Sequence, residues 1–364
     1  MRIVLAPDSF KGTATAAEAA RALADGWHSV RPHDELVLLP MADGGEGTLD
    51  AVATAHPGAT VHEVPGCTGP DGRPVPGRHL LLPDGTALVE LADASGLPLL
   101  EGRLAPLAAT SRGTGEAIAA ALDAGATALT VALGGSASTD GGAGLLSALG
   151  LRVLGHSGAL LPDGGGALAT AGQIDTRRLR PAPPGGVRLL TDVTNPLHGP
   201  DGAAAVYGPQ KGAGPSEIAL LEHGLRRYAE LLGGDPEEPG AGAAGGTAYG
   251  LATAWNARIT PGAAAVADLL GLDAALAGAD LVITGEGRFD ATSLLGKAVG
   301  EVIDRAHRAA VPVPLRVVAG DSTDGRALTL LSLSGDSHDA QRRAAHWLKL
   351  AGAHLARSAG APAH

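Results

Sequence analysis

The sequence predicts an α/β protein of two domains, in which both ends of the chain form one domain and the middle forms the other. The chain has 364 residues, which is enough for about two domains with separate cores. Near both ends, short apolar segments alternate with helical periodicity, as in parallel sheets. Between about Val61 and Asn256 the pattern changes to closely spaced strands and Gly/Pro turns. We therefore predict a parallel-sheet domain from 1–60 and 257–364, with a mixed α/β domain, 61–256, inserted into it.

The N-terminal segment reads as strand, helix, strand, helix. Residues 3–6 and 36–39 are short apolar runs, typical of buried parallel strands. Residues 14–30 have helical periodicity, with Thr13 as the predicted N-cap, and a second helix is predicted over 47–55. This order predicts a βαβ arrangement in the terminal domain.

The middle segment begins with three short strands, at 61–64, 78–82 and 87–91, separated by Gly/Pro/Asp turns that favour hairpins. Further along we predict helices at 115–124 and 144–149 and strands at 129–133 and 187–190. Two Gly-rich stretches read as an exposed loop, 158–171, and as a loop or hinge, 235–246.

The C-terminal segment returns to the α/β pattern of the N-terminus. Its predicted helices are 261–270, 300–310 and 341–356, and its predicted strands are 281–284, 315–319 and 328–333.

Composition excludes several classes of protein. The net charge of −11 and the absence of a Lys/Arg cluster argue against a nucleic-acid partner. A single cysteine, Cys67, excludes an intramolecular disulfide. The N-terminal apolar run is too short for a signal peptide, and there is no long apolar stretch for a membrane span. We therefore expect a cytoplasmic enzyme, monomeric or homodimeric, that does not bind a membrane.

Polar side chains follow the first two predicted strands, where open α/β sheets bind ligands. In the stretch DSFKG, after the first strand, Lys11 can pair with an anion and Ser9 can donate to it. After the second strand, Asp43 and Glu46 lie among glycines and can bind Mg²⁺ or substrate hydroxyls, while the glycines let the backbone approach a ligand. The alternative for both stretches is ordinary capping of the helices that follow.

A third candidate is the stretch GGSASTDGGAG at 134–144. Its glycines and hydroxyls are suited to a phosphate-binding backbone nest, although it is neither a Walker A sequence nor a dinucleotide fingerprint. A flexible turn is the alternative. We predict that phosphate groups bind here and at a lysine further along the chain, through Gly134, Gly135, Ser136, Ser138, Asp140, Gly141 and Lys211.

Two further carboxylate sites follow predicted strands, Asp192 at the first and Glu286 with Asp290 at the second. A kinase needs a group beside the attacking hydroxyl and oxygen ligands for magnesium, although each of these residues can also cap a helix. Lys211 and Lys297 can neutralise phosphate charge, or can be surface lysines. The residues alone thus indicate phosphoryl transfer but name no substrate, and an isomerase acting on a phosphorylated substrate and a non-catalytic metabolite sensor remain alternatives.

Taken together and in order, these stretches resemble the bacterial glycerate kinase family of the type that begins with APDSFKG. The matching stretches are APDSFKG (6–12), MADGGEGT (41–48), TSRGTGE (110–116), GGSASTDGGAG (134–144), TDVTNPL (191–197), YGPQKGA (207–213), PGAGAAGG (239–246) and ITGEGRFD (283–290). This chain departs from the family at Thr139, where Asn is common, and in the stretch after Ala319.

The resemblance implies a flavodoxin-like terminal domain and phosphorylation of D-glycerate by ATP with Mg²⁺. The phosphates of ATP would then bind at the predicted phosphate site in 134–144 and at Lys211. The resemblance also implies 2-phosphoglycerate as the product, with 3-kinase activity or a related 2-hydroxy acid as alternatives. We assign catalysis to Asp192, Lys11 and Asp43, and the metal to Glu286 and Asp290. The predicted substrate-binding residues are Asp8, Ser9, Lys11, Asp43, Glu46 and Asn195.

Overall fold

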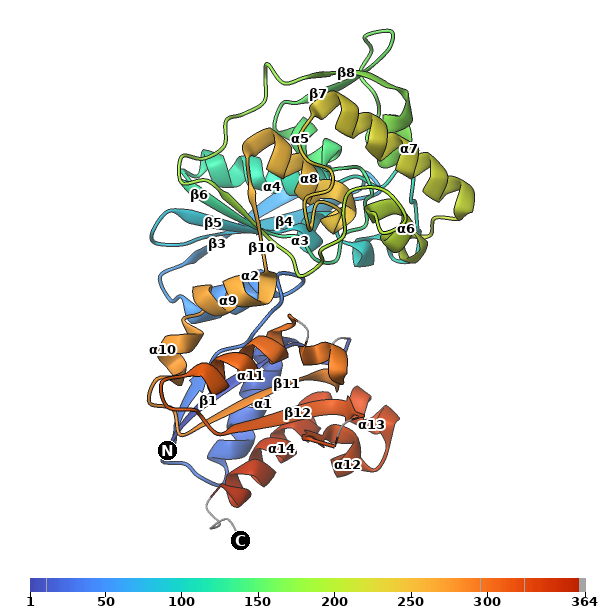
Figure 1. The fold of residues 1–364 in the computed structure, drawn as a ribbon. Coiled ribbons are helices and arrows are strands. Elements are labelled where there is room, and N and C mark those ends of the chain that lie inside the picture. The colour runs from blue at the N-terminus through green and yellow to red at the C-terminus, as the bar shows by residue number, and fades with distance from the viewer. Residues whose placement is uncertain (11, 295, 324, 360–364) are drawn as a thin grey trace. The chain divides into compact units, whose positions relative to one another are not determined.

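The computed structural model describes residues 1–359 except 11, 295 and 324. The chain divides into two compact units (Figure 1). Unit 1 consists of Met1–Asp43, Asp50–Pro57 and the C-terminal segment from Ala263, and unit 2 consists of Gly44–Leu49 and Gly58–Gly262. Both ends of the chain contribute to unit 1, so the predicted two-domain α/β organisation is confirmed.

Unit 1 is built on a five-stranded sheet of order β13-β12-β11-β1-β2, in which every pair is parallel. The strands are β1 (Arg2–Pro7), β2 (Glu35–Leu38), β11 (Leu281–Phe289), β12 (Leu315–Ser322) and β13 (Ala327–Thr329). Taken in chain order this is the 2-1-3-4-5 order of flavodoxin-like sheets. The direction of winding reverses between β1 and β11, and open α/β sheets bind ligands at such a switch point, beyond the carboxyl ends of the strands.

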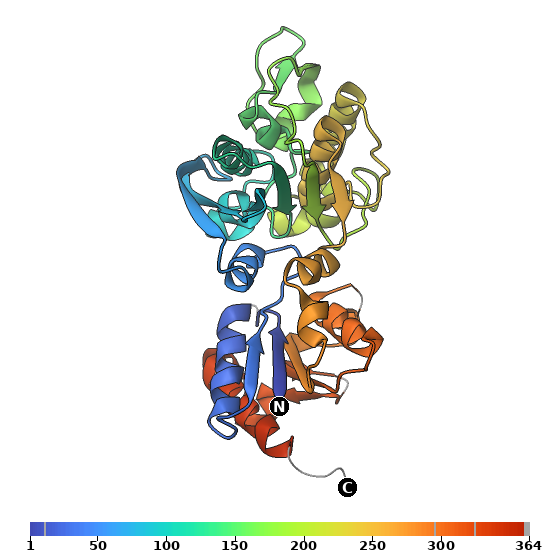
Figure 2. The ribbon, with the colours of Figure 1, turned by 90° about the vertical axis from the view of Figure 1, so that its left-hand side faces the viewer.

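Helices cover both faces of this sheet (Figure 2). On one face α1 (Ala16–His28) packs against α14 (Ala344–Ser358). Their backbones approach closely, since a Cβ at Gly352 would lie 2.2 Å from the carbonyl oxygen of Leu23. On the other face α11 (Ala298–Arg308) packs on β11. The other helices with residues in this unit are α2 (Thr48–Ala55), α9 (Gly262–Leu269), α10 (Leu272–Leu276), α12 (Leu330–Ser334), α13 (Ser337–Arg342) and the 3-10 helix η4 (Ala291–Leu294).

Two predictions that concern the helices of unit 1 are wrong. The N-cap of α1 is Thr15 rather than Thr13, because Thr15 and Glu18 form a capping box, whereas the Thr13 hydroxyl donates to the carbonyl of Phe10. The predicted strand 328–333 is a short strand followed by α12, which begins because the Thr329 hydroxyl accepts a hydrogen bond from the Ser332 amide at 3.0 Å.

Unit 2 contains a six-stranded sheet of order β10-β9-β6-β5-β4-β3. Its strands are β3 (Thr60–Thr68), β4 (Pro74–Leu81), β5 (Thr86–Glu90), β6 (Ala128–Ala132), β9 (Val187–Leu190) and β10 (Arg258–Thr260). The pairs from β5 to β10 are parallel, whereas β3, β4 and β5 pair antiparallel. The predicted hairpins are therefore confirmed, and the sheet is mixed.

The helices of unit 2 include one long element that was not predicted from the sequence, α7 (Pro215–Leu232). The others are α3 (Leu91–Ser95), α4 (Arg112–Asp123), α5 (Ala143–Ala148), α6 (Ala203–Tyr207), α8 (Ala243–Trp255) and the 3-10 helices η1 (Leu97–Leu100), η2 (Gly165–Thr170) and η3 (Pro209–Lys211). A small hairpin joins β7 (Arg152–Gly155) to β8 (Ala171–Asp175).

Both Gly-rich stretches of unit 2 are more ordered than predicted. Within 158–171, η2 packs against α7 and buries Gly165 and Leu168, so this part is not an exposed loop. Within 235–246, the last residues are buried and begin α8. Here the glycines provide left-handed backbone, with φ of +66° at Gly245 and +89° at Gly246. They therefore form a tight turn inside the fold.

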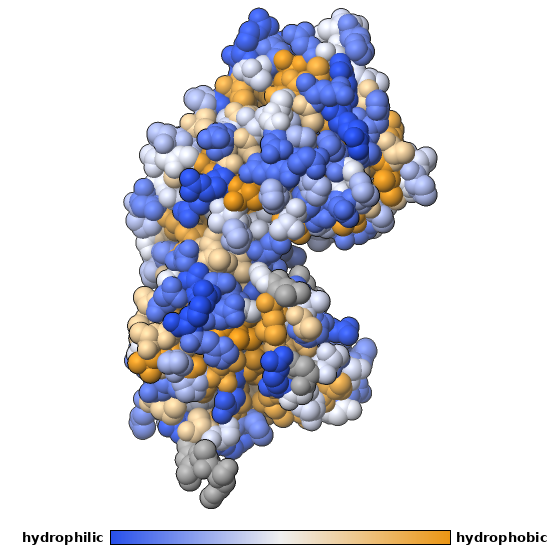
Figure 3. Space-filling view, viewed as in Figure 1, coloured by the Kyte–Doolittle hydropathy of each residue, from blue (hydrophilic) through white to orange (hydrophobic). Residues whose placement is uncertain are grey.

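In the part of the chain that the structure describes, no helix is both long and apolar enough to cross a membrane. Hydrophilic and apolar residues are interspersed over the viewed face of each unit (Figure 3).

Candidate active site

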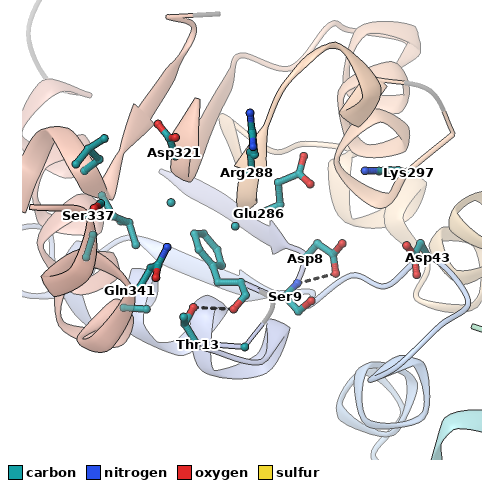
Figure 4. A pocket seen from close by; sticks show the side chains of 18 residues that line it. Asp8, Ser9, Thr13, Asp43, Glu286, Arg288, Lys297, Asp321, Ser337 and Gln341 are labelled. Atoms are coloured by element: carbon teal, nitrogen blue, oxygen red, sulfur yellow. Dashed lines mark hydrogen bonds between the residues drawn. The ribbon is translucent and has the colours of Figure 1, made fainter. Parts of the chain in front are cut away.

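A cavity of about 620 Å³ lies in unit 1, at the carboxyl ends of β1, β11 and β12. Its position agrees with the switch-point rule for doubly wound sheets. The labelled side chains in Figure 4 are Asp8, Ser9, Thr13, Asp43, Glu286, Arg288, Lys297, Asp321, Ser337 and Gln341. Four of the predicted site residues, Asp8, Ser9, Asp43 and Glu286, are thus brought to one cavity although they are far apart in the sequence.

The loop after β1 is held by the neighbouring strand. The amide of Asp8 donates to the carbonyl of Gly285 at 2.8 Å, which continues the β1–β11 pairing by one residue. The amide of Ser9 donates to the carboxylate of Asp8 at 2.6 Å. Both side chains are half-buried and line the cavity. The predicted substrate residue Lys11 lies outside the described residues.

Strand β11 carries Glu286 within the sheet, which corrects the prediction that GEGRFD follows a strand. The strand runs on to Phe289, with Glu286 opposite Ala319 and Arg288 opposite Asp321 of β12. Gly285 allows this close pairing, because a Cβ there would lie 2.0 Å from the carbonyl oxygen of Val318. Glu286 is only 8% exposed and lines the cavity, so this carboxylate is fixed by the sheet.

Asp290 does not line this cavity. Its carboxylate accepts hydrogen bonds from the amide and hydroxyl of Thr292, at 2.9 and 2.6 Å, and these bonds lower the pKa of Asp290. Lys297, which the sequence could not distinguish from a surface lysine, is the N-cap residue of α11 and does line the cavity. The cavity is therefore lined by Lys297 and not by Asp290, and the metal-binding role of Asp290 stays a prediction.

The glycines after Asp43 serve close packing of the backbone within unit 2. Gly44 has a φ of +85°, and a Cβ there would lie 2.8 Å from the Cβ of Leu190. A Cβ at Gly134 would lie 2.4 Å from the Cα of Gly45. Glu46, the predicted substrate residue beside them, is exposed.

The predicted phosphate nest, 134–144, is largely buried. The carboxylate of Asp140 accepts hydrogen bonds from the amide and hydroxyl of Ser111, at 2.9 and 2.8 Å. It also accepts from the amides of Gly142 and Gly144, at 3.1 and 3.2 Å. Burial raises the pKa of Asp140, and these hydrogen bonds oppose that shift. Two backbone amides of this stretch, those of Gly142 and Gly144, are thus used within the fold.

The backbone around this turn is equally crowded. The amide of Gly141 donates to the carbonyl of Gly245 at 3.0 Å, and a Cβ at Gly165 would lie 2.0 Å from the carbonyl oxygen of Thr139. Solvent reaches the stretch mainly at its beginning, where Gly135 is exposed and Gly134 and Ser136 are half-buried. Phosphate binding by this stretch stays a prediction.

Lys211 supports the same turn from η3. Its side chain is 2% exposed, and its ammonium group donates to the hydroxyl of Ser136 at 2.9 Å and to the carbonyl of Ser138 at 2.5 Å. Burial lowers the pKa of Lys211 to about 8. The predicted role of this lysine in ATP binding stays a prediction, and its visible role is to hold the turn.

The pKa of Lys211 predicts a specific dependence of stability on pH. Below pH 8 the folded and unfolded chains both carry the charge, so the cost of burying it is fully present. Above pH 8 the folded chain loses the proton first, so the contribution of Lys211 to the free energy of unfolding rises with pH. From pH 7.5 to 9.5, the free energy of unfolding of wild type should rise by on the order of 2 kcal/mol relative to that of Lys211→Met. Urea unfolding checks this. Exposed Lys349→Met is the control, and parallel profiles for wild type and Lys211→Met would contradict the assignment.

Asp192 and Asn195 both lie in unit 2. The exposed Asp192 follows β9, and its carboxylate accepts a hydrogen bond from the amide of Gly262 at 2.7 Å. The side chain of Asn195 donates to the carbonyl of Asp201 at 2.8 Å and accepts from the hydroxyl of Tyr207 at 2.6 Å. The side-chain amide of Asn195 therefore stabilises the loop in which it lies. The predicted contact of Asn195 with the substrate stays a prediction.

Several residues with a role in the structure were not predicted from the sequence. Glu90, 2% exposed, caps the N-terminus of α2 by accepting from the amides of Gly47 and Leu49, at 2.9 and 3.1 Å. Asp321 could have been found, because it follows the predicted strand 315–319 as Asp8 follows β1. Ser337 and Gln341 had no such signal, since only tertiary packing brings α13 to the cavity.

The fold and the cavity first define a class: this is a two-unit α/β protein with a ligand cavity at the switch point of a flavodoxin-like sheet. Comparison with known proteins then defines the family. The model of the glycerate kinase family matches residues 3–356. The glycerate kinase of Bacillus subtilis (strain 168) is 42% identical over 339 residues, which are 90% of this chain and 87% of that protein. The chain belongs to the glycerate kinase family, and it is a phosphotransferase.

Two further relatives agree. The glycerate 2-kinase of Escherichia coli (strain K12) is 42% identical over 335 residues, 89% of this chain and 86% of that protein. A crystal structure from Salmonella typhimurium LT2, assigned as a glycerate kinase 2, superposes with a TM-score of 0.84 at 38% identity and covers 99% of this chain and 98% of its own.

Proposed function

We propose that this protein transfers the γ-phosphate of ATP to the C2 hydroxyl of D-glycerate and so forms 2-phosphoglycerate. The observation that carries the proposal is the match along nearly the whole chain to relatives that include a glycerate 2-kinase. The cavity in unit 1 supports it, because carboxylates and a lysine gather there at the switch point of the sheet.

Phosphoryl transfer depends mostly on positioning and charge neutralisation. We assign Lys297 to the negative charge of the transferred phosphate. We assign Ser9 and Asp8 to the carboxylate and hydroxyl groups of glycerate, with Asp8 accepting from a hydroxyl. Asp192 is the proposed base that accepts the proton of the attacking hydroxyl, and Lys11 is proposed to pair with the substrate carboxylate.

The donor set also fits Mg²⁺. Among the described residues no group of three or more His, Cys, Asp or Glu side chains could by itself hold a metal ion. Mg²⁺ does not need a site made of three or more protein side chains, because it usually binds one or two carboxylates, substrate phosphates and water. Glu286, with Asp8 or Asp43, would hold the ion from the protein side. When bound, it supplies neutralising charge to the phosphates.

A coupled assay of ADP release tests the proposal, with glycerate, lactate, tartronate and glycerol as acceptors. We expect saturable release of ADP with D-glycerate, and ³¹P NMR of the product should show the phosphate on C2. Glu286→Gln controls for a contaminating kinase and should lower kcat at least about 100-fold. Release of ADP with none of the hydroxy acids would refute the proposal. A product phosphorylated on C3, or a preference for another 2-hydroxy acid, would favour the alternatives named above.

A further inference from the structure

The cavity in unit 1 is much larger than a three-carbon acid requires. Its volume of about 620 Å³ lies within the range of about 300–1,000 Å³ that is typical for drug-sized ligands. A second, larger molecule is therefore needed to fill it. The proposed reaction has one such reactant, the nucleotide, so a nucleotide assignment in this cavity rests on that proposed function.

The lining of the cavity differs between its two ends (Figure 4). One end carries Asp8, Asp43 and Lys297, the charged groups assigned above to phosphate, metal and acceptor. We call the opposite end the distal end. It is formed by α12, α13 and the carboxyl end of β12, through Asp321, Leu330, Leu331, Ser337, Ala340 and Gln341.

The cavity is also lined by two glycines of the sheet, Gly287 on β11 and Gly320 on β12. They lie close together, because a Cβ at Gly320 would be 2.4 Å from the carbonyl oxygen of Gly287. Neither residue places a side chain in the cavity. The peptide backbone of the two strands therefore forms this part of the cavity wall, which suits a flat ligand.

The distal end has the groups that a nucleoside needs. Leu331 and Ala340 offer apolar contact for a planar base, and Gln341 offers an amide that can donate to and accept from the base edge. Asp321 follows the central part of β12, and acidic residues near the ends of strands bind ribose hydroxyls in dinucleotide-binding sheets. Asp321 and Gln341 are both exposed to the cavity solvent rather than buried in the core.

We propose that the distal end binds the nucleoside of the phosphoryl donor, with its phosphates directed toward Lys297. The donor then lies along one cavity of unit 1, from Gln341 and Asp321 at the base and ribose to Lys297 at the phosphates. This location is compatible with the internal hydrogen bonds of the turn 134–144. It also gives a role to the cavity-lining residues Ser337 and Gln341 of α13.

Calorimetric titration of the full-length protein with ADP and with adenosine tests the assignment. Ser337 and His338 are consecutive exposed residues at the start of α13, but only Ser337 lines the cavity. Ser337→Trp should weaken both ADP and adenosine at least about tenfold, because the indole occupies the space of the base. His338→Trp adds the same indole to the same helix and should leave both affinities unchanged.

A second set of variants separates binding of the base from binding of the phosphates. Lys297→Ala should weaken ADP about tenfold and leave adenosine unchanged, because adenosine has no phosphate. Lys349→Ala, an exposed lysine outside the cavity, is the control. Gln341→Leu should weaken adenosine several-fold while keeping the size of the side chain.

The outcomes distinguish this inference from the proposed function. If wild type releases ADP with glycerate but Ser337→Trp binds ADP like wild type, the inference fails and the function stands. If wild type binds ADP with the expected pattern but phosphorylates no hydroxy acid, the distal end is supported and the proposed reaction is not. If wild type binds neither ADP nor adenosine, the inference is overturned.

Discussion

Replacing Asp140 with asparagine is expected to destabilise unit 2 by about 3 kcal/mol. The buried carboxylate of Asp140 accepts four hydrogen bonds from Ser111, Gly142 and Gly144. Asparagine has one acceptor oxygen and one NH₂ group, so at least one buried N–H would face another donor. Urea unfolding followed by circular dichroism measures the change, and amide hydrogen exchange should locate the loss in unit 2.

Asp235 provides the control for this substitution. Its exposed carboxylate accepts one hydrogen bond, from the amide of Glu237 at 2.9 Å, and asparagine can keep that bond. Asp235→Asn should therefore change the free energy of unfolding by less than about 0.5 kcal/mol. If Asp140→Asn unfolds at the same urea concentration as Asp235→Asn, the carboxylate of Asp140 does not organise the turn.

The second large effect is expected at Gly245. This buried residue has a φ of +66°, and a Cβ there would lie 2.1 Å from the carbonyl oxygen of Ser138 and 2.7 Å from the Cα of Thr139. Both contacts are with backbone, which cannot move aside as a flexible side chain can. Gly245→Ala should cost about 3–5 kcal/mol, as the sum of left-handed strain and overpacking.

Gly158→Ala separates the two contributions. Gly158 is exposed and has a φ of +80°, and a Cβ added there would meet no atom within 4 Å. The strain is therefore present without the clash, and we expect a loss of about 1–2 kcal/mol. Equal losses at Gly245 and Gly158, measured by urea unfolding, would show that close packing against Ser138 contributes nothing.

The sequence predicted the sheet of unit 1 well, because buried parallel strands are short apolar runs whatever their neighbours are. It also predicted Asp8, Ser9, Asp43 and Glu286 at the cavity, since ligands bind beyond the carboxyl ends of such strands. Thr15 could have been chosen over Thr13 as the N-cap, because Glu18 stands three residues after Thr15.

The role of the glycines could not be predicted from the sequence. A Gly-rich stretch between a strand and a helix has the same amino-acid sequence whether its amides face a phosphate or the rest of the fold. At 134–144 the answer depends on contacts with Gly45, Gly165 and Gly245, which are distant in the chain. The extension of β11 to Phe289 depends in the same way on its partner β12.

The burial of Lys211 has a consequence for chemical labelling. The chain contains only four lysines, Lys11, Lys211, Lys297 and Lys349. A pKa of about 8 makes the amine of Lys211 a good nucleophile near neutral pH, but a side chain that is 2% exposed is hidden from a reagent in solution. Lys297 and Lys349 are exposed. An acylating reagent should therefore distinguish these lysines by their access to solvent rather than by their basicity. Because Lys297 lines the cavity, the yield of acylated Lys297 should fall when a ligand occupies the cavity.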